Sequence, residues 1–278
     1  MGAIFTPVVL VVVIGLILSV ILTIASKVFF VPVDETVTKL VEELPGANCG
    51  ACGFAGCNDY AEAMAADHSL STSMCPVGGA AVAAKLAEVL GVEAGSAEKK
   101  VAVVHCNGNC DARGSILELQ GITTCEGAKQ FYGGVSACSH GCLGFGDCEA
   151  VCDFDAIHVC NGVAVVDREK CVSCGKCEKV CPNDVITIAP EKNKVIVQCK
   201  STEKAKDTMK ACKNGCIGCG KCVKVCKFEA IKVENNVAFI DPELCKNCGL
   251  CAKECPVGAI NNMRAKRKPA APKEAAEA

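Results

Sequence analysis

The spacing of the cysteines constrains this chain more than any other feature. Two unbroken runs with the pattern Cys-x2-Cys-x2-Cys-x3-Cys-Pro occupy residues 171–182 and 245–256. Three thiolates on one tight loop can point at three irons of a cubane, and the fourth cysteine of such a run ligates the neighbouring cluster. We expect this fourth cysteine to start a short helix. A zinc ion would instead need two paired Cys-x2-Cys knuckles. The runs therefore predict iron–sulfur clusters rather than zinc.

The chain from residue 101 onward contains an internal duplication. One copy reads Cys-Ser-His-Gly-Cys-Leu-Gly-Phe-Gly-Asp-Cys-x3-Cys from Cys138, and the other reads Cys-Lys-Asn-Gly-Cys-Ile-Gly-Cys-Gly-Lys-Cys-x3-Cys from Cys212. Each copy then reaches one of the unbroken runs. Upstream, Val-Val-His-Cys106 parallels Val-Ile-Val-Gln-Cys199. Self-similarity on this scale indicates repeated structural units. We therefore predict two ferredoxin-like modules, each with two cluster motifs.

Cross-ligation between motifs gives three complete ligand sets and one incomplete set. The complete sets are Cys216, Cys219 and Cys222 with Cys255; Cys245, Cys248 and Cys251 with Cys226; and Cys171, Cys174 and Cys177 with Cys152. The incomplete set is Cys142, Cys148 and Cys181, because Phe145 stands where the second ligand would be. Cys138 is the predicted substitute, although the intact copy carries its equivalent, Cys212. This site could be rearranged, hold three irons or be absent.

The remaining cysteines fall into two groups. Cys49, Cys52, Cys57 and Cys75 lie in a short glycine-rich segment and suit one cubane, with zinc as the alternative. Six others are left: Cys106, Cys110, Cys125, Cys160, Cys199 and Cys212. A sixth cluster could use Cys106, Cys110, Cys125, Cys199 or Cys212, with the first three as the leading candidates. The alternative is that several are buried thiols. We thus predict five [4Fe-4S] clusters and leave a sixth open.

The N-terminal residues predict a membrane anchor. Residues 1–26 contain no charged side chain, and Ala3 to Ala25 is long enough to span a bilayer as a helix. A cleavable signal peptide would need basic residues before this stretch, and there are none. Lys27 follows directly, so the positive-inside rule places the rest of the chain in the cytoplasm. A reducing compartment also disfavours disulfides between the 26 cysteines.

The predicted fold class is α+β, with an N-terminal transmembrane helix, a small helical 4Fe-4S domain and duplicated two-cluster ferredoxin-like modules. Helices are expected over residues 33–44 and 80–90, the second ended by Gly91, and a strand over 101–104. The expected boundaries are 1–26 for the anchor, 27–92 for the N-terminal cluster domain, 93–135 for a linking region with extra cysteines, 136–190 and 191–262 for the modules, and 263–278 for a disordered basic tail. With no Trp and two Tyr, clusters rather than large side chains should fill the small modules.

The net charge of −2 hides an uneven distribution. Residues 27–167 contain 7 basic and 18 acidic side chains, whereas residues 168–268 contain 21 basic and 11 acidic ones. The basic half could steer an acidic electron carrier towards the chain. Nucleic acid is not predicted as a partner, because the chain offers no aromatic stacking platform. The basic stretch 264–268 could instead touch anionic lipid.

The order of these parts resembles the B subunit of the Rnf electron-transport complexes. The resemblance rests on the uncharged N-terminal span, on Asn48-Cys-Gly-Ala-Cys-Gly-Phe-Ala-Gly-Cys-Asn-Asp-Tyr-Ala61 with Cys75-Pro-Val-Gly-Gly79, and on the ferredoxin modules. It covers nearly the whole chain and points to the longer, multi-cluster type found in anaerobic bacteria. Phe145 departs from this pattern and puts one cluster in doubt.

The resemblance implies a membrane complex that moves electrons between reduced ferredoxin and NAD and couples this to sodium or proton transport. This chain would be an electron-relay subunit of that ferredoxin:NAD oxidoreductase, single-pass in the cell (inner) membrane. It would accept electrons from soluble ferredoxin and pass them towards flavin subunits, with other membrane subunits and the lipid bilayer as partners. No catalytic residue is predicted. The alternative is an iron–sulfur subunit of another membrane reductase or hydrogenase-type complex.

Overall fold

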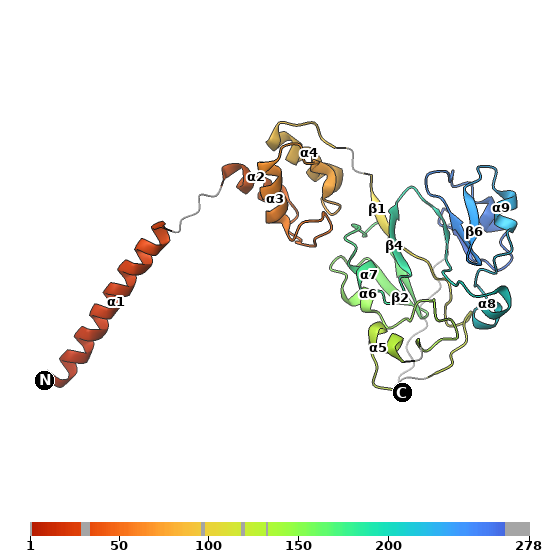
Figure 1. Cartoon of the computed structure of the whole chain (residues 1–278), viewed down its shortest axis with the longest axis horizontal. Helices are drawn as coiled ribbons and strands as arrows, with labels where there is room; N and C mark the ends of the chain where they lie inside the picture. The colour runs from red at the N-terminus through yellow and green to blue at the C-terminus, as the bar shows by residue number, and fades with distance from the viewer. Residues whose placement is uncertain (1, 29–33, 96–97, 118–119, 132, 265–278) are drawn as a thin grey trace.

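The computed structural model describes residues 2–28, 34–95, 98–117, 120–131 and 133–264, and its mixture of helices and strands confirms the α+β part of the predicted fold class (Figure 1). Its helices are α1 (Gly2–Val28), α2 (Glu35–Glu43), α3 (Cys57–Ala66), the 3-10 helix η1 (Thr72–Met74), α4 (Gly79–Leu90), α5 (Cys125–Gln130), α6 (Asp147–Ala150), α7 (Lys176–Lys179), α8 (Ala205–Ala211), α9 (Lys221–Val225) and α10 (Leu250–Lys253). Its strands are β1 (Lys100–Val104), β2 (Ile157–Cys160), β3 (Val163–Val166), β4 (Ile186–Pro190), β5 (Val195–Val197), β6 (Ile231–Glu234), β7 (Val237–Ile240) and β8 (Ile260–Asn262).

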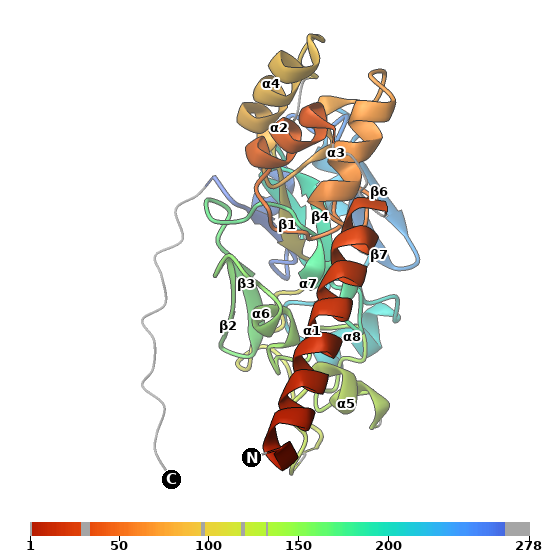
Figure 2. The ribbon, with the colours of Figure 1, turned by 90° about the vertical axis from the view of Figure 1, so that its left-hand side faces the viewer.

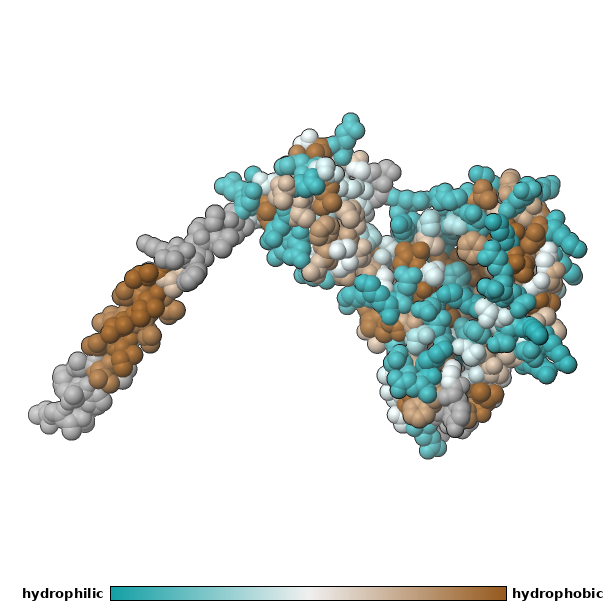
Figure 3. All heavy atoms as spheres, in the orientation of Figure 1, coloured by the Kyte–Doolittle hydropathy of each residue, from teal (hydrophilic) through white to brown (hydrophobic). Residues whose placement is uncertain are grey.

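Helix α1 exposes aliphatic side chains all round its axis. Its side chains are described at residue 10 and from residue 12 to residue 26. The large apolar ones are each about half exposed or more: Leu10, Val12, Val13, Ile14, Leu16, Ile17, Leu18, Val20, Ile21, Leu22 and Ile24. Figure 3 shows them as a continuous hydrophobic surface. Among the described residues, no helix combines the length and the hydropathy that a membrane crossing requires. The helix predicted over residues 3–25 is confirmed as a helix.

Helices α2, α3 and α4 form a small unit with its own core. The side-chain oxygen of Asp34 accepts a hydrogen bond from Thr36 N at 2.9 Å and caps α2. Leu40, Tyr60 and Leu86 are almost completely buried, each from a different helix. Helix α4 ends where Gly91 takes the left-handed conformation at φ 67°, as its position after the apolar periodicity predicted. Figures 1 and 2 show the three helices as one unit beside β1.

The two sequence copies fold in the same way. Each contains a short antiparallel hairpin, β2–β3 in the first copy and β6–β7 in the second. Each also has an outer antiparallel pair of strands, in which the strand that precedes the copy's cysteines pairs with the strand that follows its last cysteine. These outer pairs are β1–β4 and β5–β8. The strand predicted over residues 101–104 is confirmed as β1, and it is part of the first module's sheet. Each copy has its own main core, and Ile196 on β5 of the second copy packs into the core of the first.

Both copies position the first cysteine of the unbroken run by the same turn. In the first copy, Asp167 N donates to Ala156 O at 2.7 Å and Cys171 N donates to Asp167 O at 3.1 Å. In the second copy, Asp241 N donates to Ala230 O at 2.8 Å and Cys245 N donates to Asp241 O at 3.1 Å. The duplication predicted from sequence therefore extends to individual backbone hydrogen bonds.

Short helices follow a glycine in each cluster motif. Gly175, Gly220 and Gly249 adopt φ values of 77°, 68° and 77° and precede α7, α9 and α10. A residue with a Cβ would be strained there. Each helix contains the third cysteine of its run, and the fourth cysteine comes after the helix has ended. The expectation that the fourth cysteine starts a helix was wrong, because each helix begins directly after the left-handed glycine and lasts only about one turn.

Candidate metal centres

Among the residues that the structure describes, five cavities are each lined by four cysteines. The sets are Cys49, Cys52, Cys57 and Cys75; Cys152, Cys171, Cys174 and Cys177; Cys125, Cys142, Cys148 and Cys181; Cys106, Cys138, Cys199 and Cys212; and Cys216, Cys219, Cys222 and Cys255. No group of three or more metal-binding side chains among the described residues is arranged to hold one metal ion.

The N-terminal set lies where the α2–α3 loop meets the loop before α4. Asn48 Oδ1 accepts a hydrogen bond from Cys57 N at 2.8 Å and closes the loop around the cavity. A Cβ on Gly56 would lie 3.0 Å from that oxygen, so a larger residue there would push the Asn48 side chain away from Cys57 N. Burial, followed by smaller contributions from neighbouring thiolates that include Cys52 and Cys57, raises the pKa of Cys75. Gly78 N donates to Cys75 Sγ at 3.4 Å. The structure brings all four predicted residues together.

The set that contains Cys152 joins cysteines from both motifs of the first module. Burial raises the pKa of Cys177 to about 12, and the thiolates of Cys171, Cys174 and Cys152 add to the shift. Ala102 N, on β1, donates to Cys171 Sγ at 3.3 Å, and Ala156 N donates to Cys152 Sγ at 3.4 Å. Amide donors of this kind stabilise thiolate sulfur. The cross-ligation predicted from spacing thus corresponds to one cavity.

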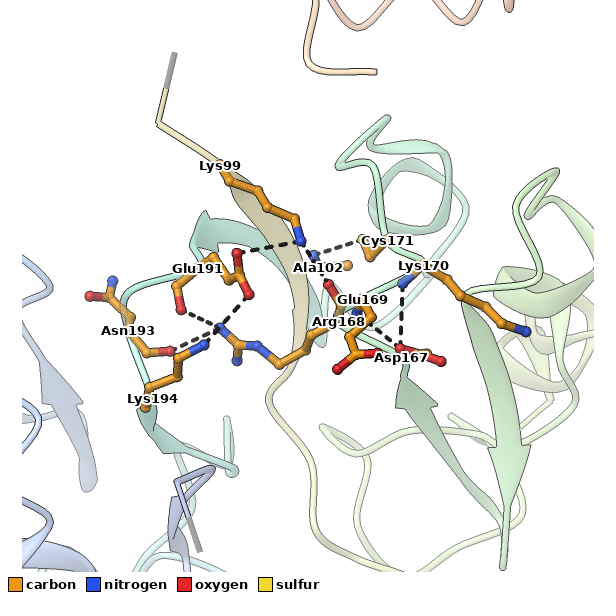
Figure 4. Close-up of polar contacts among 10 residues, drawn as sticks. All are labelled: Lys99, Ala102, Asp167, Arg168, Glu169, Lys170, Cys171, Glu191, Asn193 and Lys194. Carbon is orange, nitrogen blue, oxygen red and sulfur yellow. Dashed lines mark hydrogen bonds and ion pairs between the residues drawn. The ribbon is translucent and has the colours of Figure 1, made fainter. Parts of the chain in front are cut away.

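A polar cluster holds the loop before Cys171 against the end of β4 (Figure 4). The Arg168 guanidinium donates to Glu191 O at 2.9 Å and to Asn193 O at 3.1 Å. Lys99 Nζ lies 3.4 Å from Glu191 Oε2. Asp167 Oδ1 accepts from Glu169 N at 2.9 Å. This cluster ties the cysteine loop to both strands of the β1–β4 pair and so fixes the position of Cys171.

The second module repeats the arrangement. Cys216, Cys219, Cys222 and Cys255 line one cavity, as the spacing predicted. For the other predicted set, burial raises the pKa of Cys251 to about 11, with further contributions from Cys245 and Cys248. Cys226 packs with Cys245 against the same core as Cys251. Cys219 and Cys248 are exposed, so both parts of this module reach the surface.

In the structure, the incomplete set near Phe145 includes Cys125, which the sequence had suggested as a ligand of a possible sixth cluster. Cys125, Cys142, Cys148 and Cys181 line one cavity, whereas the predicted substitute Cys138 lines a different one. Burial raises the pKa of Cys148 to about 12, and the thiolates of Cys142, Cys125 and Cys181 contribute. Asp147 Oδ1 accepts from Cys125 N at 2.9 Å and fixes the start of α5. The sequence contained one signal for this role of Cys125. It lies in the segment between Cys106 and Cys138, and the corresponding segment of the second copy is shorter.

The other cysteines proposed for a sixth cluster are also redistributed. Cys106, Cys199 and Cys212 share a cavity with Cys138. Cys110 and Cys160 line none of the five cavities, and both are exposed. The thiolate chemistry of these sets, together with the amide donors to Cys75, Cys152 and Cys171, fits iron–sulfur ligation.

Family profiles match three of these regions. Residues 44–77 match a family described as "Putative Fe-S cluster", residues 164–187 match "4Fe-4S binding domain", and residues 215–259 match "4Fe-4S dicluster domain". Multiple [4Fe-4S] clusters are therefore the cofactors of this chain.

Relatives cover almost the whole chain. The B subunit of the Na(+)-translocating ferredoxin:NAD(+) oxidoreductase complex from Acetobacterium woodii is 47% identical over 94% of this chain and 78% of its own length. The chain belongs to the family of Rnf B subunits. The B subunit of the proton-translocating complex from Clostridium ljungdahlii is 44% identical over 94% of this chain and 93% of its length. The B subunit of an ion-translocating oxidoreductase complex from Methanosarcina acetivorans is 39% identical over 88% of this chain and 93% of its length.

This Rnf protein is thus an iron–sulfur electron-transfer subunit of a membrane-bound, multi-subunit ferredoxin:NAD(+) oxidoreductase complex. Electrostatic interactions link neighbouring cysteine sets to one another. In each adjacent pair of sets, a thiolate of one set raises the pKa of a cysteine in the next, after the larger effect of burial. The linking pairs are Cys49 and Cys174, Cys177 and Cys148, Cys106 and Cys142, Cys216 and Cys199, and Cys222 and Cys251.

Proposed function

We propose that this subunit accepts electrons from reduced ferredoxin at its second module and passes them to the flavin subunits and NAD beyond its N-terminal domain. The linear order of the cysteine sets carries the proposal. It begins at the exposed Cys248 of the second module and ends at Cys49, in the unit next to α1. The [4Fe-4S] clusters, when bound, supply one-electron carriers at each set.

The protein residues of each set would hold the thiolates, most of them away from bulk water. The five predicted sets, with Cys125 in the place that Phe145 leaves empty, supply four cysteines each. Most of these thiols are buried or half-buried, and backbone amides face Cys75, Cys152, Cys171 and Cys245. Burial and amide hydrogen bonds are the means by which a protein sets a cluster's potential.

The surface around the proposed entry suits an acidic carrier. Lys227, Lys246 and Lys253 are exposed and lie within two residues of cysteines of the Cys226 set. None of the three forms an ion pair with any residue that the structure describes. Phe239 and Leu244 are also exposed on this module. Unpaired positive charge around a small apolar patch favours the docking of a soluble acidic protein.

The function is tested with the full chain, purified without oxygen and carrying its clusters. Substoichiometric reduced ferredoxin should bleach the visible iron–sulfur absorbance of the chain, and NADH should not form even when NAD is present. NADH formation by this chain alone would mean an independent reductase site. Failure of reduced ferredoxin to bleach the chain, while NADH bleaches it, would reverse the proposed order of donors.

We also propose that α1 anchors the protein in the membrane, with the remaining chain on the cytoplasmic side. Aliphatic side chains that are exposed on every face of a helix are stable only in an apolar environment. The membrane-bound complex that includes this chain provides such an environment in its bilayer.

Removal of residues 1–28 is expected to release the chain from lipid. The full chain should co-sediment with phospholipid vesicles, whereas the shortened chain should stay in the supernatant at the same protein concentration. Retained iron content in the shortened chain shows that its remaining domains are intact. Equal co-sedimentation of both chains would exclude α1 as the anchor.

A further inference from the structure

One four-cysteine cavity is shared between the two copies of the duplication. Cys106 follows β1 of the first copy, and Cys199 follows β5 of the second. Cys138 and Cys212 likewise hold the same position in the two copies, four residues before the first cysteine of each ferredoxin motif. The cavity, of about 440 Å³ with its open mouth included, is therefore lined by two equivalent cysteines from each copy. None of the family matches includes any of these four residues.

The two copies are joined by backbone and side-chain contacts around this cavity. Lys213 N donates to Ala112 O at 2.7 Å, next to an isolated β-bridge between Arg113 and Cys212. Asn214 Nδ2 donates to Asn107 O at 2.8 Å. A ring nitrogen of His105 lies 2.8 Å from Val197 O. These contacts hold Cys212 and the residues near Cys106 and Cys199 in a fixed relation.

The cavity has space next to sulfur where side chains are absent. A Cβ on Gly108 would lie 3.3 Å from Cys212 Sγ and 3.6 Å from Cys106 Sγ. A Cβ on Gly141 would lie 3.5 Å from both Cys106 Sγ and Cys138 Sγ. Neither glycine has a positive φ, so chain conformation does not require glycine at these positions. Two glycines that leave the sulfurs accessible from the cavity are the cradle that a bound inorganic group needs.

Hydrogen-bond donors point at the same sulfurs. Cys142 N donates to Cys106 Sγ at 3.3 Å, and Gly108 N donates to it at 3.4 Å. The Gln198 side chain lines the cavity and is more than nine-tenths buried, and its Oε1 has no hydrogen-bond partner among the described residues. The Cys106 and Cys212 side chains are each 8% exposed. Buried thiols beside amide donors suit an anionic inorganic group.

We propose that Cys106, Cys138, Cys199 and Cys212 bind a further [4Fe-4S] cluster that bridges the two ferredoxin modules. The donor set is four thiolates without carboxylate, which suits a cubane. The site adjoins the first module's Cys142 set, because Cys142 N donates to Cys106 Sγ at 3.3 Å, and its Cys199 and Cys212 belong to the same copy as the Cys216 set. The proposal goes beyond the electron-relay function, and its test measures composition rather than electron flow.

The test starts with the unaltered full chain, reconstituted with iron and sulfide without oxygen. Native mass spectrometry and chemical analysis should give about 24 irons and 24 sulfides per chain, against about 20 if only the other five sets are filled. A count of about 20 irons in a chain whose other sets are full would overturn the proposal. So would one zinc per chain that is retained at this stage.

Paired variants locate the cluster. The first-copy pair Cys106→Ser and Cys138→Ser, and the second-copy pair Cys199→Ser and Cys212→Ser, should each lose about four irons. The quadruple variant should lose the same four irons and no more, because all four residues serve one cluster. A loss of about eight irons in the quadruple variant would assign the pairs to two sites and contradict the proposal. The pair Cys110→Ser and Cys160→Ser is the matched control and should lose none. Unchanged spectra of the N-terminal and second-module clusters show that a variant has folded.

Discussion

Replacing Cys125 by alanine is expected to remove about four irons from the chain. The reason is that Cys125 completes the cavity that Phe145 would otherwise leave with three cysteines. Iron and sulfide analysis of the anaerobically reconstituted full chain measures the loss. Reduction of the N-terminal cluster by ferredoxin should also slow, because the Cys142 set lies between the second module and Cys49 in the spatial order.

A double variant separates this assignment from the one that the sequence suggested. If Cys125 and Cys138 serve different sites, Cys125→Ala with Cys138→Ala should lose about eight irons. If Cys138 were instead the fourth ligand of the Phe145 site, the single change Cys125→Ala would cost no iron. Cys110→Ala is the control, since Cys110 is exposed and lines none of the five cavities.

Reversing the charge of Lys227, Lys246 and Lys253 to glutamate is expected to slow electron entry from ferredoxin. The bimolecular rate at low ionic strength should fall about 10- to 100-fold, because an acidic partner would be repelled rather than steered. The difference should shrink as salt is added, since charges separated by more than about 10 Å are screened at 0.1 M ionic strength. Stopped-flow mixing of reduced ferredoxin with the full chain gives the rate.

The matched control carries the same change of charge on another surface. Lys204, Lys206 and Lys210 are exposed on or beside α8, on a different part of the second copy. Their replacement by glutamate should change the rate only slightly. Equal slowing in both triple variants would show that net charge matters and that docking is not confined to the surface around Cys248.

The sequence predicted what short-range geometry determines. The Cys-x2-Cys-x2-Cys loops that begin at Cys171 and Cys216 each place three thiolates together, and each lines one cavity with the fourth cysteine that the spacing predicted. Gly91 ended α4, and the apolar stretch before Cys106 formed β1, because caps and strand patterns are local signals.

Two ligand assignments could not be read from spacing. Cys125 and Cys142 meet because Asp147 accepts a hydrogen bond from Cys125 N, which is a contact between separate segments. Cys106 and Cys212 meet only because the two copies pack against each other. The repeat did contain the relevant signal, since Cys106 matches Cys199 and Cys138 matches Cys212. To use this signal, equivalent cysteines of the two copies have to be treated as ligands of one shared site rather than as ligands of two separate sites.

The packing of the two copies also affects the order in which the cysteine sets can be completed during synthesis. Domains fold roughly in the order in which the ribosome releases them. The N-terminal set and the sets within the first module are complete before the second copy has been synthesised. The cavity of Cys106, Cys138, Cys199 and Cys212 exists only once both copies are present and docked. We therefore expect this shared site to receive iron only after the sets of the first module, and a chain that ends before Cys199 to carry only two of its four cysteines.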